Sequence, residues 1–153
     1  MSKILLVLRH AKAAQVLGLD DHERPLTERG LADARGVGDH LREQSLLPDR
    51  VLCSTSLRTR QTFDALAIDV PVSYERGIYA NDVADLRTLI RVTGDDVGVL
   101  LLIGHNPSFH ELAVELTGQR IESFPTSALA VIEMVSWEDG DGGLTAVRTP
   151  RTG

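Results

Sequence analysis

A short apolar run that ends in two basic residues constrains the fold of this chain more than any other feature. Residues 4–8 are all apolar, and Arg9 and His10 follow them directly. Five consecutive apolar residues are typical of a strand in a parallel sheet, which is buried on both of its faces. Ligands of such open sheets bind just beyond the carboxyl ends of the strands. The run therefore predicts a buried strand that delivers a guanidinium and an imidazole to a binding edge.

The same arrangement recurs twice further along the chain. Residues 50–53 predict a second strand that leads towards Arg58, and residues 97–103 predict a third that leads to His105. A single basic pair after a strand could be no more than a polar strand end, but recurrence at three strands favours a common site. Parallel strands would bring these ends to one edge of the sheet and form a pocket suited to a phosphate dianion. The basic side chains gathered there would be Arg9, His10, Arg58 and His105.

Helical patterns alternate with strand patterns along the rest of the chain, and this alternation predicts an α/β fold. The expected helices start after Thr27, near Ser56, after Asp82 and at Asn106, and the further strands are 72–74, 128–135 and 144–147. Asn106 followed by Pro107 is a favourable N-cap and first-turn pair. We expect one three-layer domain over residues 1–148, with a mainly parallel central sheet, helices on both faces and a mobile tail at 149–153.

Composition limits the classes of function. The formal net charge of −6 argues against a nucleic-acid binder, which would need a basic face. The single cysteine excludes an internal disulfide and fits a reducing compartment, so we expect a cytoplasmic protein. The N-terminal apolar run is too short for a signal-peptide core, and no stretch approaches the length of a transmembrane helix. A membrane partner is therefore not expected.

Four segments, in order along the chain, resemble the motifs of the histidine phosphatase superfamily. Residues 8–11 (Leu-Arg-His-Ala) are similar to its Arg-His-Gly motif, with Ala11 in place of the glycine. Residues 24–30 resemble its Pro-Leu-Thr-x-x-Gly segment, and 54–62 resemble its second arginine motif. Residues 104–107 (Gly-His-Asn-Pro) resemble its second histidine motif. The short length is most similar to the phosphohistidine-phosphatase branch of SixA type, which implies a phosphoglycerate mutase-like fold.

The resemblance also implies a mechanism. His10 would be the nucleophile and would form a phosphohistidine intermediate, which requires a neutral imidazole with one free nitrogen. Arg9 and Arg58 would favour that neutral form and would hold the phosphoryl oxygens in the transition state. His105 would donate a hydrogen bond to the phosphoryl group. No metal and no cofactor is implied.

Three further residues have open assignments. In many relatives an acidic residue protonates the leaving group, and Glu75 lies in the corresponding region, although it could equally be a solvated surface glutamate. Arg24 could close over the substrate or could pair with one of the acids beside it in the loop at residues 11–26. Thr126 could line the pocket or cap a turn.

Two other chemistries fit the sequence poorly. A cysteine phosphatase needs its cysteine and arginine separated by five residues, but only four residues lie between Cys53 and Arg58. Cys53 is therefore expected to be a small buried strand residue. A metal site lacks paired cysteines, and His105 and His110 are not on one helical face.

The expected activity is hydrolysis of a phosphomonoester or phosphoramidate, with phosphohistidine on a protein as the favoured substrate. Small sugar or nucleotide-derived phosphates fit the same pocket and remain an alternative. A mutase would need a site closed to water, and this short chain has little material for a lid. A phosphate-binding module without catalysis is the remaining alternative, which His10 argues against because arginines alone would bind phosphate.

Overall fold

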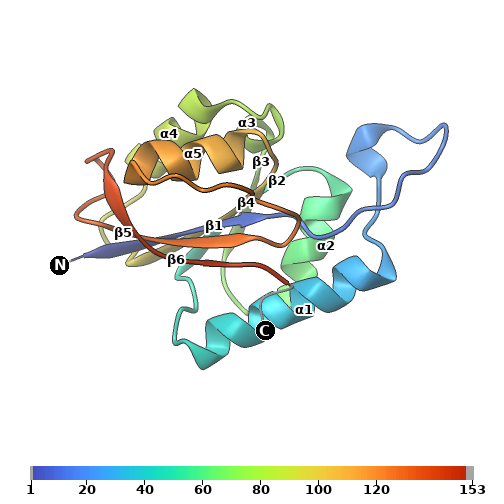
Figure 1. The fold of residues 1–153 in the computed structure, drawn as a ribbon, viewed down its shortest axis with the longest axis horizontal. Helices are drawn as coiled ribbons and strands as arrows, with labels where there is room; N and C mark the ends of the chain where they lie inside the picture. Colours follow the sequence, from blue (N-terminus) through green and yellow to red (C-terminus); the bar gives the residue numbers. More distant parts are fainter. Residues whose placement is uncertain (1, 151–153) are drawn as a thin grey trace.

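A six-stranded mixed sheet forms the centre of the molecule in the computed structural model, which describes residues 2–150 (Figure 1). The strands are β1 (Lys3–Arg9), β2 (Arg50–Ser54), β3 (Val72–Glu75), β4 (Val99–Gly104), β5 (Leu129–Met134) and β6 (Gly142–Arg148). Their order across the sheet is β3-β2-β4-β1-β5-β6. The first four strands are mutually parallel, whereas β5 pairs antiparallel with both β1 and β6. The predicted, mainly parallel sheet is confirmed.

The apolar run of β1 is buried on both faces, as its sequence predicts. Leu5 and Val7 pack into a hydrophobic cluster on one face, while Leu6 and Leu8 pack into a second cluster on the other. All four side chains are fully buried. The alternation follows from the two-residue repeat of a strand, and it makes β1 the central element of both hydrophobic layers.

Helices cover both faces of the sheet and complete the three predicted layers (Figure 1). The helices are α1 (Glu28–Glu43), α2 (Leu57–Leu66), α3 (Arg76–Tyr79), α4 (Val83–Arg91) and α5 (Ser108–Thr117), with a short 3-10 helix η1 (Asp21–Glu23) before α1. Helices α1 and α2 contact each other on one face, and α4 and α5 contact each other on the opposite face. Right-handed crossovers explain this division, because the chain moves across the sheet in one direction from β1 to β3 and then returns to β4.

The predicted helix starts are correct in three cases and wrong in one. Thr27 caps α1 by accepting a hydrogen bond from the Gly30 amide at 3.0 Å, and Asp82 caps α4. Ser56 directly precedes α2. Asn106 does not cap α5, whose N-cap position is Pro107. The Ser108 amide donates instead to the side chain of Asn81 at 3.0 Å, a partner 27 residues away that local sequence could not reveal.

Gly38 shows why a glycine stands in the middle of α1, where it lowers helix propensity. A Cβ atom at this position would collide with the backbone carbonyl oxygen of Leu66, the last residue of α2. The glycine therefore lets α1 and α2 approach closely. The contact fixes the position of α2, which compensates for the lower helix propensity of glycine.

The predicted tail lies partly outside the described residues. Strand β6 ends at Arg148, and residues 151–153 are not described. Thr149 and Pro150 line a cavity of about 260 Å³ together with residues such as Arg29 of α1. The expected domain limit at 148 stays a prediction. Within residues 2–150, none of the helices is long and apolar enough to cross a membrane.

Candidate active site

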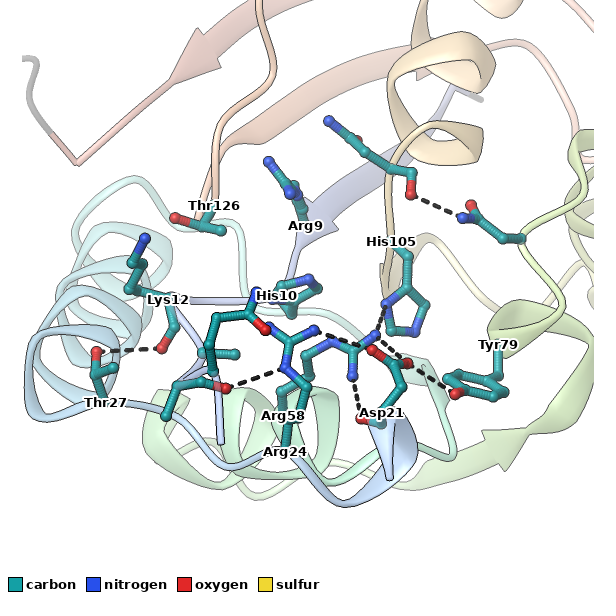
Figure 2. A pocket seen from close by; sticks show the side chains of 15 residues that line it. Arg9, His10, Lys12, Asp21, Arg24, Thr27, Arg58, Tyr79, His105 and Thr126 are labelled. Carbon is teal, nitrogen blue, oxygen red and sulfur yellow. Dashed lines mark hydrogen bonds and ion pairs between the residues drawn. The ribbon is translucent and has the colours of Figure 1, made fainter. Parts of the chain in front are cut away.

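Three parallel strands end at the same level, where the sequence predicts a site. The register pairs Arg9 of β1 with Gly104 of β4, and Cys53 of β2 with Ile103 of β4. A cavity of about 800 Å³ opens at this edge, and we call it the strand-end pocket (Figure 2). The predicted residues that line it are Arg9, His10, Arg24, Arg58, His105 and Thr126. Its other lining residues are Lys12, Ala13, Ala14, Gln15, Asp21, Thr27, Tyr79, Asn81 and Asn106.

His10 has one ring nitrogen committed and one free. Its Nδ1 lies 2.7 Å from the carbonyl oxygen of Ala11, which can only accept, so Nδ1 carries the proton and donates it. In the neutral ring the lone pair is therefore on Nε2. The pKa of His10 is lowered to about 4, mainly by burial; the Ala11 hydrogen bond opposes this shift, and the charges of Arg58 and Arg9 add to it. His10 is thus neutral at pH 7, with Nε2 available as a nucleophile.

This arrangement predicts the pH dependence of His10. Protonation of Nε2 removes the nucleophilic lone pair, so activity that depends on His10 is expected to fall as the pH drops below about 4. An unperturbed histidine titrates around pH 6.5. Because His10 stays neutral there, we expect it to cause no change in activity around that pH. Ring-nitrogen NMR measures the transition directly, with His10→Ala assigning the resonance. A His10 transition near pH 6.5 would contradict the buried neutral state.

Arg58 lies at the centre of the polar contacts in the strand-end pocket. Its Nη1 donates to the backbone carbonyl of Asp21 at 2.8 Å, and its Nη2 donates to Asp21 Oδ2 at 3.1 Å. The same Nη2 lies 3.3 Å from Nδ1 of His105. Because a guanidinium has no acceptor, this His105 nitrogen must accept. Arg58 therefore joins the start of α2, the loop before α1 and the end of β4.

His105 is neutral, and both of its ring nitrogens are engaged. Since Nδ1 accepts from Arg58, the proton is on Nε2, which donates to Ser54 Oγ at 2.7 Å. Burial lowers the pKa of His105 to about 3, and the neighbouring His10 and Arg58 contribute in the same direction. His105 can donate to a phosphoryl group only when the proton now given to Ser54 is redirected. Its expected role as a donor stays a prediction.

Both arginines retain donors that could bind an oxyanion. Arg9 Nη1 donates to the carbonyl of Phe124 at 3.2 Å, which anchors the side chain. The Nε atoms of Arg9 and Arg58 are buried and have no hydrogen-bond partner among the described residues. Because these Nε atoms are buried, an oxyanion in the strand-end pocket would be bound by the Nη groups of the two arginines that line it.

Asp21 is the main residue of the pocket that sequence analysis did not assign. Its carboxylate accepts hydrogen bonds from Arg24 at 3.0 Å, Arg58 at 3.1 Å and the Tyr79 hydroxyl at 2.8 Å (Figure 2). Burial would raise its pKa, but these hydrogen bonds outweigh that effect and lower the pKa of Asp21 to about 2. In the sequence, only the run of charged residues around Asp21 could have indicated that it belongs to the site. Arg24 pairs with Asp21 and also lines the pocket; its closing over a substrate stays a prediction.

The structure does not bring Glu75 to the strand-end pocket. Glu75 ends the edge strand β3 and lines a separate cavity of about 150 Å³ with Arg50, Leu52 and Leu89. Strand alternation explains this placement, because Tyr74 packs into the cluster on the α1–α2 face and the next side chain turns to the α4 face. The expectation that Glu75 protonates the leaving group has no support from its position. Sequence spacing located the strand end but not the direction of the side chain.

Cys53 lies on the hydrophobic layer between the sheet and the α1–α2 helices. It is fully buried, and burial raises the pKa of its thiol to about 12. The thiolate that a cysteine phosphatase requires would not form at neutral pH. Cys53 is thus the buried strand residue that the sequence predicts. In residues 2–150, no cluster of three or more histidine, cysteine, aspartate or glutamate side chains could hold a metal ion.

Thr62 of α2 links the backbone that follows His10 to the backbone of Arg58. Its hydroxyl accepts a hydrogen bond from the Ala11 amide at 3.0 Å and donates to the carbonyl of Arg58 at 2.7 Å. Ala11 is the residue whose carbonyl sets the tautomer of His10. Thr62 is fully buried and does not line the pocket. It is therefore a positioning residue that holds His10 and Arg58 in register.

We expect Thr62→Val to lower kcat by roughly tenfold or more, with a smaller change in KM. Valine has the same shape but leaves the Ala11 amide buried without an acceptor, so the backbone that orients His10 should shift. Thr62→Ser keeps the hydroxyl and should retain most of the activity. Ring-nitrogen NMR of His10 should show a changed tautomer ratio in the valine variant only. Equal activity of the two variants would contradict a positioning role.

Comparison with known proteins agrees with this geometry. The family model of the histidine phosphatase superfamily (branch 1) matches residues 5–89, which is more than half of the chain. An uncharacterised protein of Mycobacterium tuberculosis (strain CDC 1551 / Oshkosh) is 38% identical over 151 residues, covering 92% of this chain and 96% of that protein. The phosphohistidine phosphatase SixA of Escherichia coli (strain K12) is 30% identical over 145 residues, covering 90% and 88%.

A solved structure extends the similarity to three dimensions. A protein from Nakamurella multipartitia, assigned as phosphohistidine phosphatase SixA, superposes with a TM-score of 0.92 at 28% identity and covers 99% of this chain and 98% of its own. The chain belongs to the histidine phosphatase superfamily. Within that superfamily it is of the short SixA type, and it is a hydrolase with the phosphoglycerate mutase-like fold expected from the sequence.

Proposed function

We propose that this protein is a phosphohistidine phosphatase that transfers the phosphoryl group to Nε2 of His10 and then to water. The similarity to SixA proteins supports the substrate, and the free Nε2 of a neutral His10 supports the nucleophile. Arg9 and Arg58, which line the strand-end pocket, would bind the phosphoryl oxygens through their Nη groups. His105 would assist once its proton is redirected from Ser54.

One observation carries the choice of substrate. Among the described residues that line the strand-end pocket, Asp21 is the one carboxylic acid, and its pKa of about 2 keeps it ionised at neutral pH. An alkyl phosphate expels an alkoxide, which needs a proton from a general acid. Phosphohistidine expels an imidazole, which leaves with much less help. The pocket therefore suits the cleavage of a phosphorus–nitrogen bond.

The reaction would proceed in two balanced steps. In the first, the second ring nitrogen of the substrate phosphohistidine takes a proton from solvent; the Nε2 lone pair of His10 then forms a bond to phosphorus while the phosphorus–nitrogen bond of the substrate breaks, and the substrate ring leaves as neutral imidazole with the bonding electron pair. In the second, water attacks the phosphorylated His10, releasing inorganic phosphate and restoring the free ring. Positioning and charge neutralisation by Arg9 and Arg58 would supply most of the rate enhancement in both steps. A mutase would have to keep water out, and the Asp21 side chain in this pocket is 53% exposed.

We also infer that the protein acts in the cytoplasm and does not bind nucleic acid. Its one cysteine is an unpaired buried thiol, which suits a reducing compartment. Its formal net charge of −6 opposes non-specific attraction to a polyanion.

A substrate series tests the proposed function. We expect the wild-type enzyme to hydrolyse phosphohistidine with a kcat/KM at least about 100 times that for glycerol phosphate, because a general acid contributes roughly this factor or more to alkoxide departure. Para-nitrophenyl phosphate should also be hydrolysed, since its phenolate is a good leaving group. Glu75→Gln should change none of these rates. Equal efficiency on glycerol phosphate, or a selective loss of that activity in Glu75→Gln, would contradict the proposal.

A further inference from the structure

An apolar turn projects beside the strand-end pocket. Val16, Leu17 and Leu19 are 46%, 103% and 41% exposed, respectively. The Leu19 amide donates to the Val16 carbonyl at 3.2 Å, which closes the turn, and Gly18 between them has a φ of 83°. A positive φ at this position is typical of a type II turn and places Leu17 at the outer corner. We call residues 16–19 the apolar turn.

Backbone and side-chain hydrogen bonds hold together the two chain segments on either side of the apolar turn. Below it, Ala13 and Leu26 form an antiparallel bridge, and the Ala14 amide donates to the Pro25 carbonyl at 2.8 Å. Arg24 ties the two sides together by donating from Nε to the Ala14 carbonyl at 3.0 Å. Figure 1 shows the chain between β1 and α1, in blue, extending away from the body of the molecule. The turn is thus held at a fixed place relative to the pocket.

The same segment forms part of the pocket wall. Ala14 and Gln15 line the strand-end pocket immediately before the turn, and Asp21 and Arg24 line it immediately after. The lining stops at Gln15, so a small phosphorylated metabolite inside the pocket would not contact Leu17. A ligand that contacts Leu17 must extend beyond the pocket.

We propose that the apolar turn is a docking surface for the folded protein that carries the phosphohistidine. This inference rests on the proposed function and extends it from the phosphoryl group to the surface around it. The turn would pack against an apolar patch beside the modified histidine while the phosphoryl group enters the strand-end pocket.

The distribution of exposed apolar residues supports a specific surface. Among the described residues, the large apolar side chains that are exposed are Val16, Leu17, Leu19, Leu47, Val92 and Val135. Three of these six lie within one four-residue turn, next to the pocket, whereas the other three are isolated in the sequence. Scattered exposed apolar residues are normal, but a cluster at the rim of a site marks an interaction surface.

The charges beside the turn identify the chemistry of the partner. Asp20 follows the turn directly and Glu23 lies four residues after it, and both are exposed. Acidic neighbours disfavour an anionic membrane surface, which attracts basic residues. A protein whose phosphohistidine is flanked by apolar and basic side chains is complementary to this rim.

Matched substrates test the docking surface. The double variant Leu17→Ser/Leu19→Ser is assayed on a folded protein chemically phosphorylated at a surface histidine flanked by apolar and basic residues, on free phosphohistidine and on para-nitrophenyl phosphate. We expect kcat/KM for the phosphorylated protein to fall by roughly tenfold or more, because the contact with the substrate protein would lose the apolar area of two leucine side chains. The two small substrates should be unaffected. The matched control is Val135→Ser, which also removes an exposed apolar residue. Val135 follows Met134, and Met134 pairs with Lys3 at the end of β1 that is far from His10. This control variant should leave all three rates unchanged.

The outcomes separate this inference from the proposed function. If the wild-type enzyme hydrolyses neither phosphohistidine substrate, the proposed function fails and the docking surface fails with it. If the wild-type enzyme hydrolyses both and the double variant keeps the same ratio between them, only the docking surface is overturned. A change from dimer to monomer in the double variant, with that ratio unchanged, would also overturn it and would make the turn a contact between copies of this chain.

Discussion

His10→Ala is expected to lower kcat/KM for para-nitrophenyl phosphate by roughly four to six powers of ten, the loss typical of removing a catalytic nucleophile. The side chain carries the free Nε2 in the strand-end pocket. The other imidazole there, His105, has both ring nitrogens engaged, and the thiol of Cys53 is buried with a pKa raised to about 12. The position of His10 at the end of β1, outside the hydrophobic clusters, means that the fold should survive. Circular dichroism and thermal melting would verify this.

Trapping provides the positive evidence for the same prediction. The wild-type enzyme, quenched in alkali during turnover with radiolabelled substrate, should carry an alkali-stable, acid-labile phosphate on His10. The alanine variant should carry none. Undiminished hydrolysis by a folded His10→Ala protein would contradict the mechanism, and so would label on another residue.

Arg58→Ala is expected to lower kcat/KM by roughly two to four powers of ten, which corresponds to the loss of about 3–5 kcal/mol of transition-state stabilisation. Arg58 is buried beside His10 and His105, where electrostatic interactions are weakly screened. Its loss would also leave Asp21 paired with Arg24 and the Tyr79 hydroxyl only, so the less neutralised carboxylate would repel the phosphoryl group. Arg58→Lys restores the charge without the forked geometry and should recover only part of the activity.

Arg60→Ala is the matched control for Arg58. Arg60 is on the same helix but is exposed, donates to the Thr55 carbonyl at 3.0 Å and lies over the Tyr74 ring. It does not line the strand-end pocket. Its removal should leave kcat/KM within about twofold of the wild type, because surface substitutions usually have small effects. Equal losses in the two variants would show that Arg58 acts through general charge or stability and not at the reacting group.

Residues whose placement depends on the local chain could be predicted from the sequence. The apolar run before Arg9 and His10 identified a buried strand, and the polar positions at its end had to face the ligand edge of the sheet. Thr27, followed by a helical pattern, identified the start of α1. In these cases a few consecutive residues determine both the element and its end.

Contacts between distant segments could not be predicted in this way. The Asp21 carboxylate meets Arg58 and Tyr79 only because the loop before α1 folds back over the strand ends. Thr62 meets the Ala11 amide across 51 residues. Glu75 shows the opposite error, since its sequence position suggested the pocket but the alternation along β3 turned it towards α4.

The sequence by itself determined the α/β class, the central strand and the four basic residues of the site. These follow from local patterns, because apolar runs and polar strand ends are specified by a few consecutive residues. The cap expected at Asn106, in contrast, was decided by the distant Asn81. Only the tertiary structure decided the protonation and pairing of the site, including the neutral His10 and the ionised Asp21. The physical reason is that burial and hydrogen bonding shift a pKa through neighbours in space, which come here from β1, α2, β4 and the loop before α1.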